Sequence, residues 1–204
     1  MTILEKLERK FQFFGFKNFN LYLVAIFLVG LLINMINPLY YYFNLSLDVD
    51  KVLQGQIWRL FTFVFYPPSS GVSIILSLLM IFVYYSITKT LIMMWGNFKF
   101  NIYIFIGYLS HILAAFFIYF VMRQNVIFYP VYTTFSIIMA FALSFPDAYF
   151  LIYFLIPIKA KYFAYVEIVL YAISFIFSNF ANRVAIIASA INVFVFFVLL
   201  KNKI

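Results

Sequence analysis

The sequence contains no cysteine, one histidine and few charged residues. Without cysteine the chain forms no disulfide, holds no thiolate metal site and has no cysteine nucleophile. A single histidine excludes metal sites built from several histidines. Charged residues make up 10% of the 204 residues, whereas a soluble domain has about 25%. We therefore expect no metal and no cofactor.

Hydrophobic residues make up 67% of the chain, which is more than a water-soluble fold covers with polar surface. In a bilayer, backbone hydrogen bonds must close within helices or within a barrel. Barrel strands would alternate apolar and polar residues. The apolar runs are instead continuous and about 20 residues long, which is the length of a helix that crosses the hydrocarbon core. The sequence therefore predicts an all-α membrane protein.

We predict six membrane-spanning helices. A basic, amphipathic leader over residues 1–18 is expected on the cytoplasmic membrane surface, and the membrane domain occupies residues 19–204. Within the polar stretch 44–57 we expect a short interfacial helix. The apolar segment 150–158 is too short to span, so we expect it at an interface. The predicted spans are residues 19–38, 70–93, 101–121, 127–145, 160–178 and 183–200.

The net charge of +8 would indicate nucleic-acid binding in a soluble protein. Here the basic residues lie scattered between apolar runs, so the charge reports membrane topology and we expect no nucleic-acid partner. With the N-terminus inside, ten of the fourteen Lys and Arg residues fall on the cytoplasmic side. The positive-inside rule therefore places both termini in the cytoplasm. We expect the plasma membrane of a bacterium.

His111 is the only conventional base that a serine hydrolase could use, and it lies in the third predicted span. It belongs to a stripe of small residues, with Gly107 four residues before it and Ala115 four residues after it. Such a stripe lets a neighbouring helix approach closely, so an interhelical hydrogen bond is the main interpretation. A polar role in a cavity and a role as catalytic base are the alternatives.

Three further polar residues, Glu167, Ser189 and Asn192, lie within predicted spans. Glu167 either lines a polar cavity or pairs with a lysine. Ser189 belongs to a ridge of small residues that packs against another span, and Asn192 is interpreted as a packing contact. Together with His111 these residues form a possible intramembrane polar cluster. The hydroxyls of the fourth predicted span, which we expect to bond back to their own helix backbone, are Thr133, Thr134, Ser136 and Ser144.

Four segments carry a resemblance to the rhomboid superfamily. Residues 37–44 read NPLYYYFN and residues 56–62 read QIWRLFT. In this order they resemble the approach to the second rhomboid helix, most closely that of the Derlins. Residues 95–109 resemble the turn into the third helix, and residues 141–172 resemble the run from the fourth helix into the fifth. The resemblance covers about residues 35–175 and implies a six-helix, rhomboid-like core.

The chain departs from active rhomboids at both catalytic positions. An active rhomboid carries Gly-x-Ser-Gly in its fourth helix and a histidine base in its sixth. Residues 130–135 contain no such motif, and Ala188-Ser189 stands where the histidine would be. The resemblance therefore implies a pseudoprotease, not an enzyme, that binds transmembrane segments or lipid. A small transporter or permease component is the alternative, and an intramembrane serine protease with a non-standard dyad is a remote one.

The resemblance singles out Trp58 and Arg59, because in this family the motif anchors the outer interfacial loop. We expect Arg59 to bond loop carbonyls or lipid phosphates. The alternative is an ordinary interface anchor, with Trp58 at headgroup depth and Arg59 on a phosphate. The expected partners are membrane lipids and transmembrane client proteins.

Overall fold

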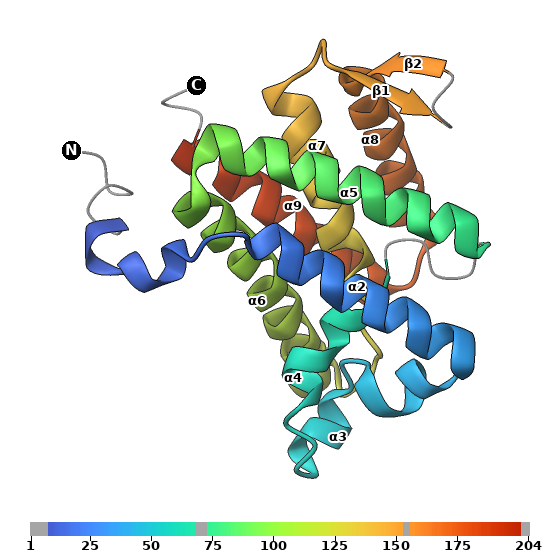
Figure 1. Ribbon diagram of the computed structural model, residues 1–204. Helices are drawn as coiled ribbons and strands as arrows, with labels where there is room; N and C mark the ends of the chain where they lie inside the picture. Colours follow the sequence, from blue (N-terminus) through green and yellow to red (C-terminus); the bar gives the residue numbers. More distant parts are fainter. Residues whose placement is uncertain (1–7, 68–72, 153–155, 201–204) are drawn as a thin grey trace.

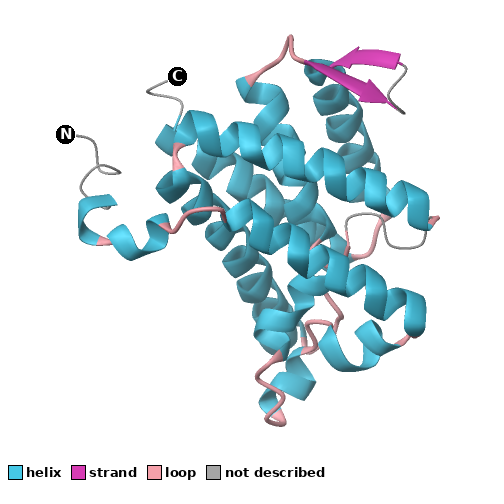
Figure 2. Ribbon diagram, viewed as in Figure 1, coloured by secondary structure: helices cyan, strands magenta, loops and turns pink. Residues whose placement is uncertain are grey.

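The computed structural model describes residues 8–67, 73–152 and 156–200, and it is mostly helical (Figures 1 and 2). Its long helices lie within about one helical turn of the predicted spans, so the predicted helix positions are confirmed. The long helices are α2 (Phe19–Ile36), α5 (Ile74–Trp95), α6 (Asn97–Met122), α7 (Val131–Ser144), α8 (Ala160–Phe177) and α9 (Phe180–Leu200).

Four of these helices, α2, α5, α6 and α8, are long and apolar enough to cross a membrane. The helix α7 and the part of α9 over residues 182–194 are shorter apolar helices. The chain therefore has the build of a multi-pass helical membrane protein, as the apolar runs predict.

Helix ends follow from local sequence. The Ser73 hydroxyl caps α5 by accepting a hydrogen bond from the Leu76 N–H at 3.4 Å. Gly96, with φ of 83°, lets the chain reverse directly from α5 into α6. The helix α2 ends two residues before Pro38, since the residue before a proline disfavours helical geometry.

The connections form two ends of the bundle. The loop end consists of residues 37–67 and 123–130, which are joined where the Phe128 N–H donates to the Leu47 carbonyl at 3.1 Å. The hairpin end consists of residues 145–159. The elements of the loop end are the π-helical turn η2 (Tyr41–Leu45), α3 (Val49–Leu53), α4 (Arg59–Thr62) and the 3-10 turn η3 (Phe63–Phe65). The short helix predicted within 44–57 is thus present as α3.

The hairpin end holds two strands that the sequence pattern did not predict. Strands β1 (Tyr149–Ile152) and β2 (Ile156–Lys159) pair antiparallel, with Tyr149 opposite Lys159 (Figure 1). Their sequence is almost uniformly apolar, so it lacks the alternation that identifies a half-buried strand. The segment is too short to span, as expected, and it closes on itself before α8 begins.

The helix α6 lies at the centre and packs against α5, α7 and α9. Its small residues Ala114 and Ala115 share a buried cluster with Ala185 and Ala188 of α9. The leader is held to the same helix, because the Asn101 side-chain amide donates to the Phe14 carbonyl at 2.6 Å. The leader is not one continuous helix in its described part: Gln12–Gly15 forms the 3-10 turn η1, and residues 1–7 lie outside the described chain.

The helix α8 lies at the edge of the bundle. It packs mainly against α7 and α9 and buries only Ala160, Ala164 and Glu167 among its 18 residues. Much of its remaining surface is apolar and exposed, including Tyr165 and Val169. This surface is suited to contact with lipid.

Candidate functional site

Arg59 is buried at the loop end, with 2% of its surface exposed. Its Nε donates to Gln56 Oε1 at 2.8 Å and its Nη1 donates to the Ser46 carbonyl at 2.9 Å. Its Nη2 donates to the Phe43 carbonyl. All three guanidinium nitrogens are therefore bonded, and the predicted contact between Arg59 and loop carbonyls is confirmed.

Trp58, the neighbour of Arg59, is much more exposed. Its ring is half exposed, while its indole N–H donates to the Asn44 carbonyl at 3.1 Å. The Thr62 hydroxyl donates to the Leu45 carbonyl at 3.0 Å. The side chains of residues 58–62 thus hold the backbone of residues 43–46, and we call this set of contacts the loop anchor. An aromatic ring on the surface with its N–H satisfied suits an interfacial position.

A tyrosine cluster connects the loop anchor to the start of α7. The Tyr41 hydroxyl donates to the Phe63 carbonyl at 2.6 Å. The Tyr66 ring lies 5.0 Å from that of Tyr41 and 4.9 Å from that of Tyr129, centroid to centroid. These separations are typical of favourable aromatic pairs, so the loop end is packed as well as hydrogen-bonded.

His111 of α6 is fully buried and faces α7. Its Nδ1 lies 3.0 Å from the Gly107 carbonyl oxygen and 2.9 Å from Thr133 Oγ1, which confirms the predicted interhelical contact. A hydrogen bond to the Gly107 carbonyl places the proton on Nδ1, whereas a hydrogen bond from the Thr133 hydroxyl leaves Nδ1 without it. Which of the two forms depends on the tautomer of His111.

Asn192 of α9 lies at the same junction. Its amide donates to Ser136 Oγ at 3.1 Å, and the Tyr103 hydroxyl donates to the Ser136 carbonyl at 2.8 Å. A Cβ on Gly107 would lie 2.7 Å from Asn192 Nδ2 and 2.8 Å from Thr133 Cγ2. Glycine at position 107 therefore lets α6, α7 and α9 meet. We call these contacts the polar junction.

Most hydroxyls of α7 bond back to their own helix, as predicted. Thr134 donates to the carbonyl four residues earlier, and so does Ser144. Ser136 donates to the Thr133 carbonyl, three residues earlier, at 2.7 Å. Thr133 is the exception, because its hydroxyl contacts His111.

The four residues of the predicted polar cluster do not form one group. His111 and Asn192 meet at the polar junction, whereas Glu167 lies in a separate cavity. Ser189 donates to the Ile186 carbonyl of its own helix at 3.0 Å. The Tyr171 hydroxyl donates to the Tyr132 carbonyl of α7 at 3.3 Å, and Tyr171 lines the same cavity as Glu167. Sequence reasoning missed Tyr171, although its position four residues after Glu167 puts both on one helix face.

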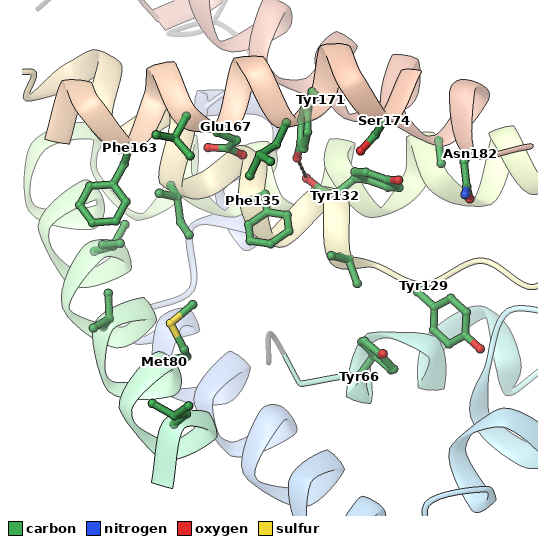
Figure 3. Close-up of a pocket in the computed structure, with 18 of the residues that line it drawn as sticks. Tyr66, Met80, Tyr129, Tyr132, Phe135, Phe163, Glu167, Tyr171, Ser174 and Asn182 are labelled. Carbon is green, nitrogen blue, oxygen red and sulfur yellow. Dashed lines mark hydrogen bonds between the residues drawn. The ribbon is translucent and has the colours of Figure 1, made fainter. Parts of the chain in front are cut away.

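The cavity is a cleft of about 940 Å³ between α5 and α8, with α7 at its back (Figure 3). It extends along α5 from Leu76 to Ile87, a length of about 16 Å at 1.5 Å per residue. Phe135 of α7 projects into it, and Tyr66 and Tyr129 mark its loop end (Figure 3). Most of the lining is apolar or aromatic, which is the usual character of a binding site with few polar contacts.

Glu167 is the only acidic residue that lines the cleft within the described chain. Its Oε1 is buried and has no hydrogen-bond partner among the described residues. Among the described residues no lysine pairs with Glu167, and the lysine of the same helix, Lys161, bonds to Asp147 at 3.2 Å. The cavity-lining alternative is thus the one that the geometry supports.

Asp147 links the end of α7 to the start of α8. Its carboxylate bonds the ammonium groups of Lys159 at 3.1 Å and Lys161 at 3.2 Å. These two hydrogen bonds hold the pKa of Asp147 below its usual range, and the same carboxylate raises the pKa of Lys159. Asp147 is exposed, so the pairing is a surface feature of the hairpin end.

Comparison with known proteins gives no match: no family model, no curated protein and no solved structure is similar to the chain.

Proposed function

We propose that this is a six-span membrane protein with a rhomboid-like core, and that it binds transmembrane segments of other proteins in the cleft between α5 and α8 without cleaving them. The cleft carries the proposal. It is elongated, apolar and bounded by two helices, which suits a partner that is itself an apolar helix.

The arrangement of the helices supports six spans. Four are long and apolar enough to cross a bilayer on their own. The helix α7 has 14 residues, a length of about 21 Å, but eight of them are buried against other helices. A helix that is buried within the bundle has little contact with lipid, so its length need not match the bilayer. The basic residues favour the hairpin end as the cytoplasmic side.

The rhomboid resemblance supports the same assignment from the motifs. The loop anchor is formed by the QIWRLFT motif, between the first and second long helices, where the resemblance expects an anchored loop. No histidine base stands on α9, and the single histidine lies on α6, where its Nδ1 contacts the Gly107 carbonyl and the Thr133 hydroxyl. These observations favour binding over hydrolysis.

The absence of cysteine gives a direct test of cleft occupancy, because single cysteines can be labelled cleanly. Ser174→Cys places a bimane label in the cleft, and Ala172→Cys places the same label on the exposed face of α8, at a similar depth. The probe is a transmembrane leucine–alanine helix with a central tryptophan, which quenches bimane on contact. Both variants are reconstituted in lipid vesicles with increasing amounts of this helix.

We expect quenching that saturates for Ser174→Cys and only proportional, collisional quenching for Ala172→Cys. Equal, non-saturating quenching at both positions would overturn the proposal. Lipids that carry a doxyl group on the acyl chain provide the second arm. If they quench both labels equally and the helix does not relieve the quenching at Ser174→Cys, lipid fills the cleft and the proposal fails.

The lack of hydrolysis has its own test. A fluorophosphonate or isocoumarin probe should leave the purified protein unlabelled, since no serine lies beside an available base. Labelling that disappears in Ser136→Ala or Ser189→Ala would contradict the pseudoprotease assignment.

A further inference from the structure

Glu167 occupies the middle of the cleft wall that α8 provides. It follows Ala160 and Ala164 on the buried stripe of the helix, and Tyr171 and Ser174 continue that stripe along the cleft. The Glu167 and Tyr171 side chains both line the cavity, and the Tyr171 hydroxyl donates to the Tyr132 carbonyl (Figure 3). The carboxyl group is therefore buried with respect to water but accessible to a ligand in the cleft.

The described part of the chain does not provide a cation for this carboxyl group. No Lys, Arg or His lines the cleft in the part of the chain that the structure describes. Lys161 is bound to Asp147, and His111 contacts Thr133 on the far side of α7. The Tyr171 hydroxyl donates to the Tyr132 carbonyl, and Glu167 Oε1 has no hydrogen-bond partner among the described residues. An ionisable group with an unused acceptor in an apolar site is costly, and a partner that supplies a donor removes that cost.

The depth of Glu167 distinguishes a lipid chain from a transmembrane helix as the occupant of the cleft. It lies seven residues past the first residue of α8, about 10 Å into the bundle at 1.5 Å per residue. A phospholipid offers only methylene groups at that depth, because its polar groups stay at the interface. A transmembrane helix can carry a hydrogen-bond donor at any depth. The unused acceptor of Glu167 therefore matches a helix and not a lipid chain.

We infer that the cleft selects transmembrane helices that carry a basic side chain level with Glu167, and that the Glu167 carboxylate binds this basic side chain. This inference rests on the proposed function, since it names the class of partner for the same cleft. A lysine or arginine pairs with the carboxylate inside the membrane, where such pairs mark functional contacts.

The test uses the leucine–alanine helix with lysine, leucine or glutamate at the residue that lies level with Glu167. Binding to the bimane label of Ser174→Cys is compared in two backgrounds, Glu167 unchanged and Glu167→Gln. Asp147→Asn is the control for loss of a carboxylate outside the cleft. We expect the lysine helix to bind about tenfold more tightly than the leucine helix, and the preference to disappear only in Glu167→Gln.

Three results separate this inference from the proposed function. If lysine and leucine helices bind equally when Glu167 is present, selection by Glu167 is wrong while the cleft remains a helix-binding site. If the preference persists in Glu167→Gln, another group reads the lysine and the inference fails. If no helix binds, the proposed function itself fails. The glutamate helix is tested with Glu167 unchanged. It should bind more weakly than the leucine helix, and equal binding of the two helices would also overturn the inference.

Discussion

Among the described residues, Arg59 and Glu167 are charged side chains that are buried, and their surroundings differ. Arg59 at the loop end donates from all three of its guanidinium nitrogens to oxygens of residues 43–56. Glu167 in the cleft has an oxygen with no partner among the described residues. The first group is stabilised by hydrogen bonds to polar groups of its own loop, and the second is left with an unused acceptor.

The difference separates structure from function. A buried charge whose hydrogen bonds are all satisfied fixes the backbone around it, as Arg59 fixes the loop between α2 and α5. A buried charge with an open acceptor lowers stability, and natural proteins keep such features mainly at functional sites. The loop end thus has the character of a scaffold, and the cleft is where we propose that a partner binds.

The largest effect is expected where α2 meets the scaffold. A Cβ on Gly30 would overlap the carbonyl oxygen of Phe65, and backbone on both sides leaves no room to adjust. Gly30→Ala should destabilise the protein by more than about 3 kcal/mol, or prevent folding, because the two elements must separate. Gly15→Ala is the control, since its new Cβ would meet Phe98 at an ordinary 3.7 Å. Thermal unfolding in one detergent compares them, and equal midpoints would contradict the packing of α2 on η3.

The second effect tests the loop anchor itself. Arg59→Lys keeps the charge but loses the planar fork that bonds three acceptors at once. We expect a loss of about 2 to 3 kcal/mol in the free energy of unfolding, and Arg59→Ala should be at least as harmful. Arg123→Lys makes the same exchange at an exposed position and should change the unfolding midpoint little. If all three variants unfold with the wild-type midpoint, Arg59 does not hold the loop.

The third effect has the opposite sign. Glu167→Leu removes an unsatisfied carboxyl group from an apolar cleft, so the empty protein should gain about 1 kcal/mol of stability. Glu167→Asp keeps the carboxyl group and should bring no gain. Thermal unfolding of both variants without any added helix measures this. A lower midpoint for Glu167→Leu would mean that the carboxyl group is a structural element and not an open binding group.

The long helices could be predicted from the sequence, because continuous apolar runs mark them. The contacts of Trp58 and Arg59 with the loop were expected from the rhomboid resemblance and not from a local pattern, and they lie within residues 43–62. The strands β1 and β2 could not be predicted, since an apolar run without alternation has no distinct period. The contacts of α3 with α6 were missed for another reason: Asp50 reaches Tyr119 across a long separation in sequence.

Only part of the cleft could be predicted from the sequence. Glu167 stands out in the sequence as a carboxylate within an apolar span, and a cavity was one of its two expected surroundings. Whether it faces a cavity or a lysine depends on how α8 lies relative to α5 and α7, which no local pattern encodes. The grouping of Glu167 with His111 was unsupported for the same reason, since α7 stands between them.

The smallest effect concerns a charge that is paired but exposed, on Asp147 beside Lys159 and Lys161 at the hairpin end. Hydrogen bonds to these lysines lower the pKa of Asp147 in the folded state, so they stabilise the fold when the carboxylate is ionised. This contribution is fully present above the unfolded-state pKa and is lost as the pH falls through the lowered folded-state pKa.

Asp147→Asn should therefore lower the unfolding midpoint slightly at neutral pH, and the difference from wild type should vanish at acidic pH. High salt should also reduce the difference, because solvent ions screen exposed pairs. A difference that persists under both conditions would show that Asp147 acts through the backbone turn and not through its charge.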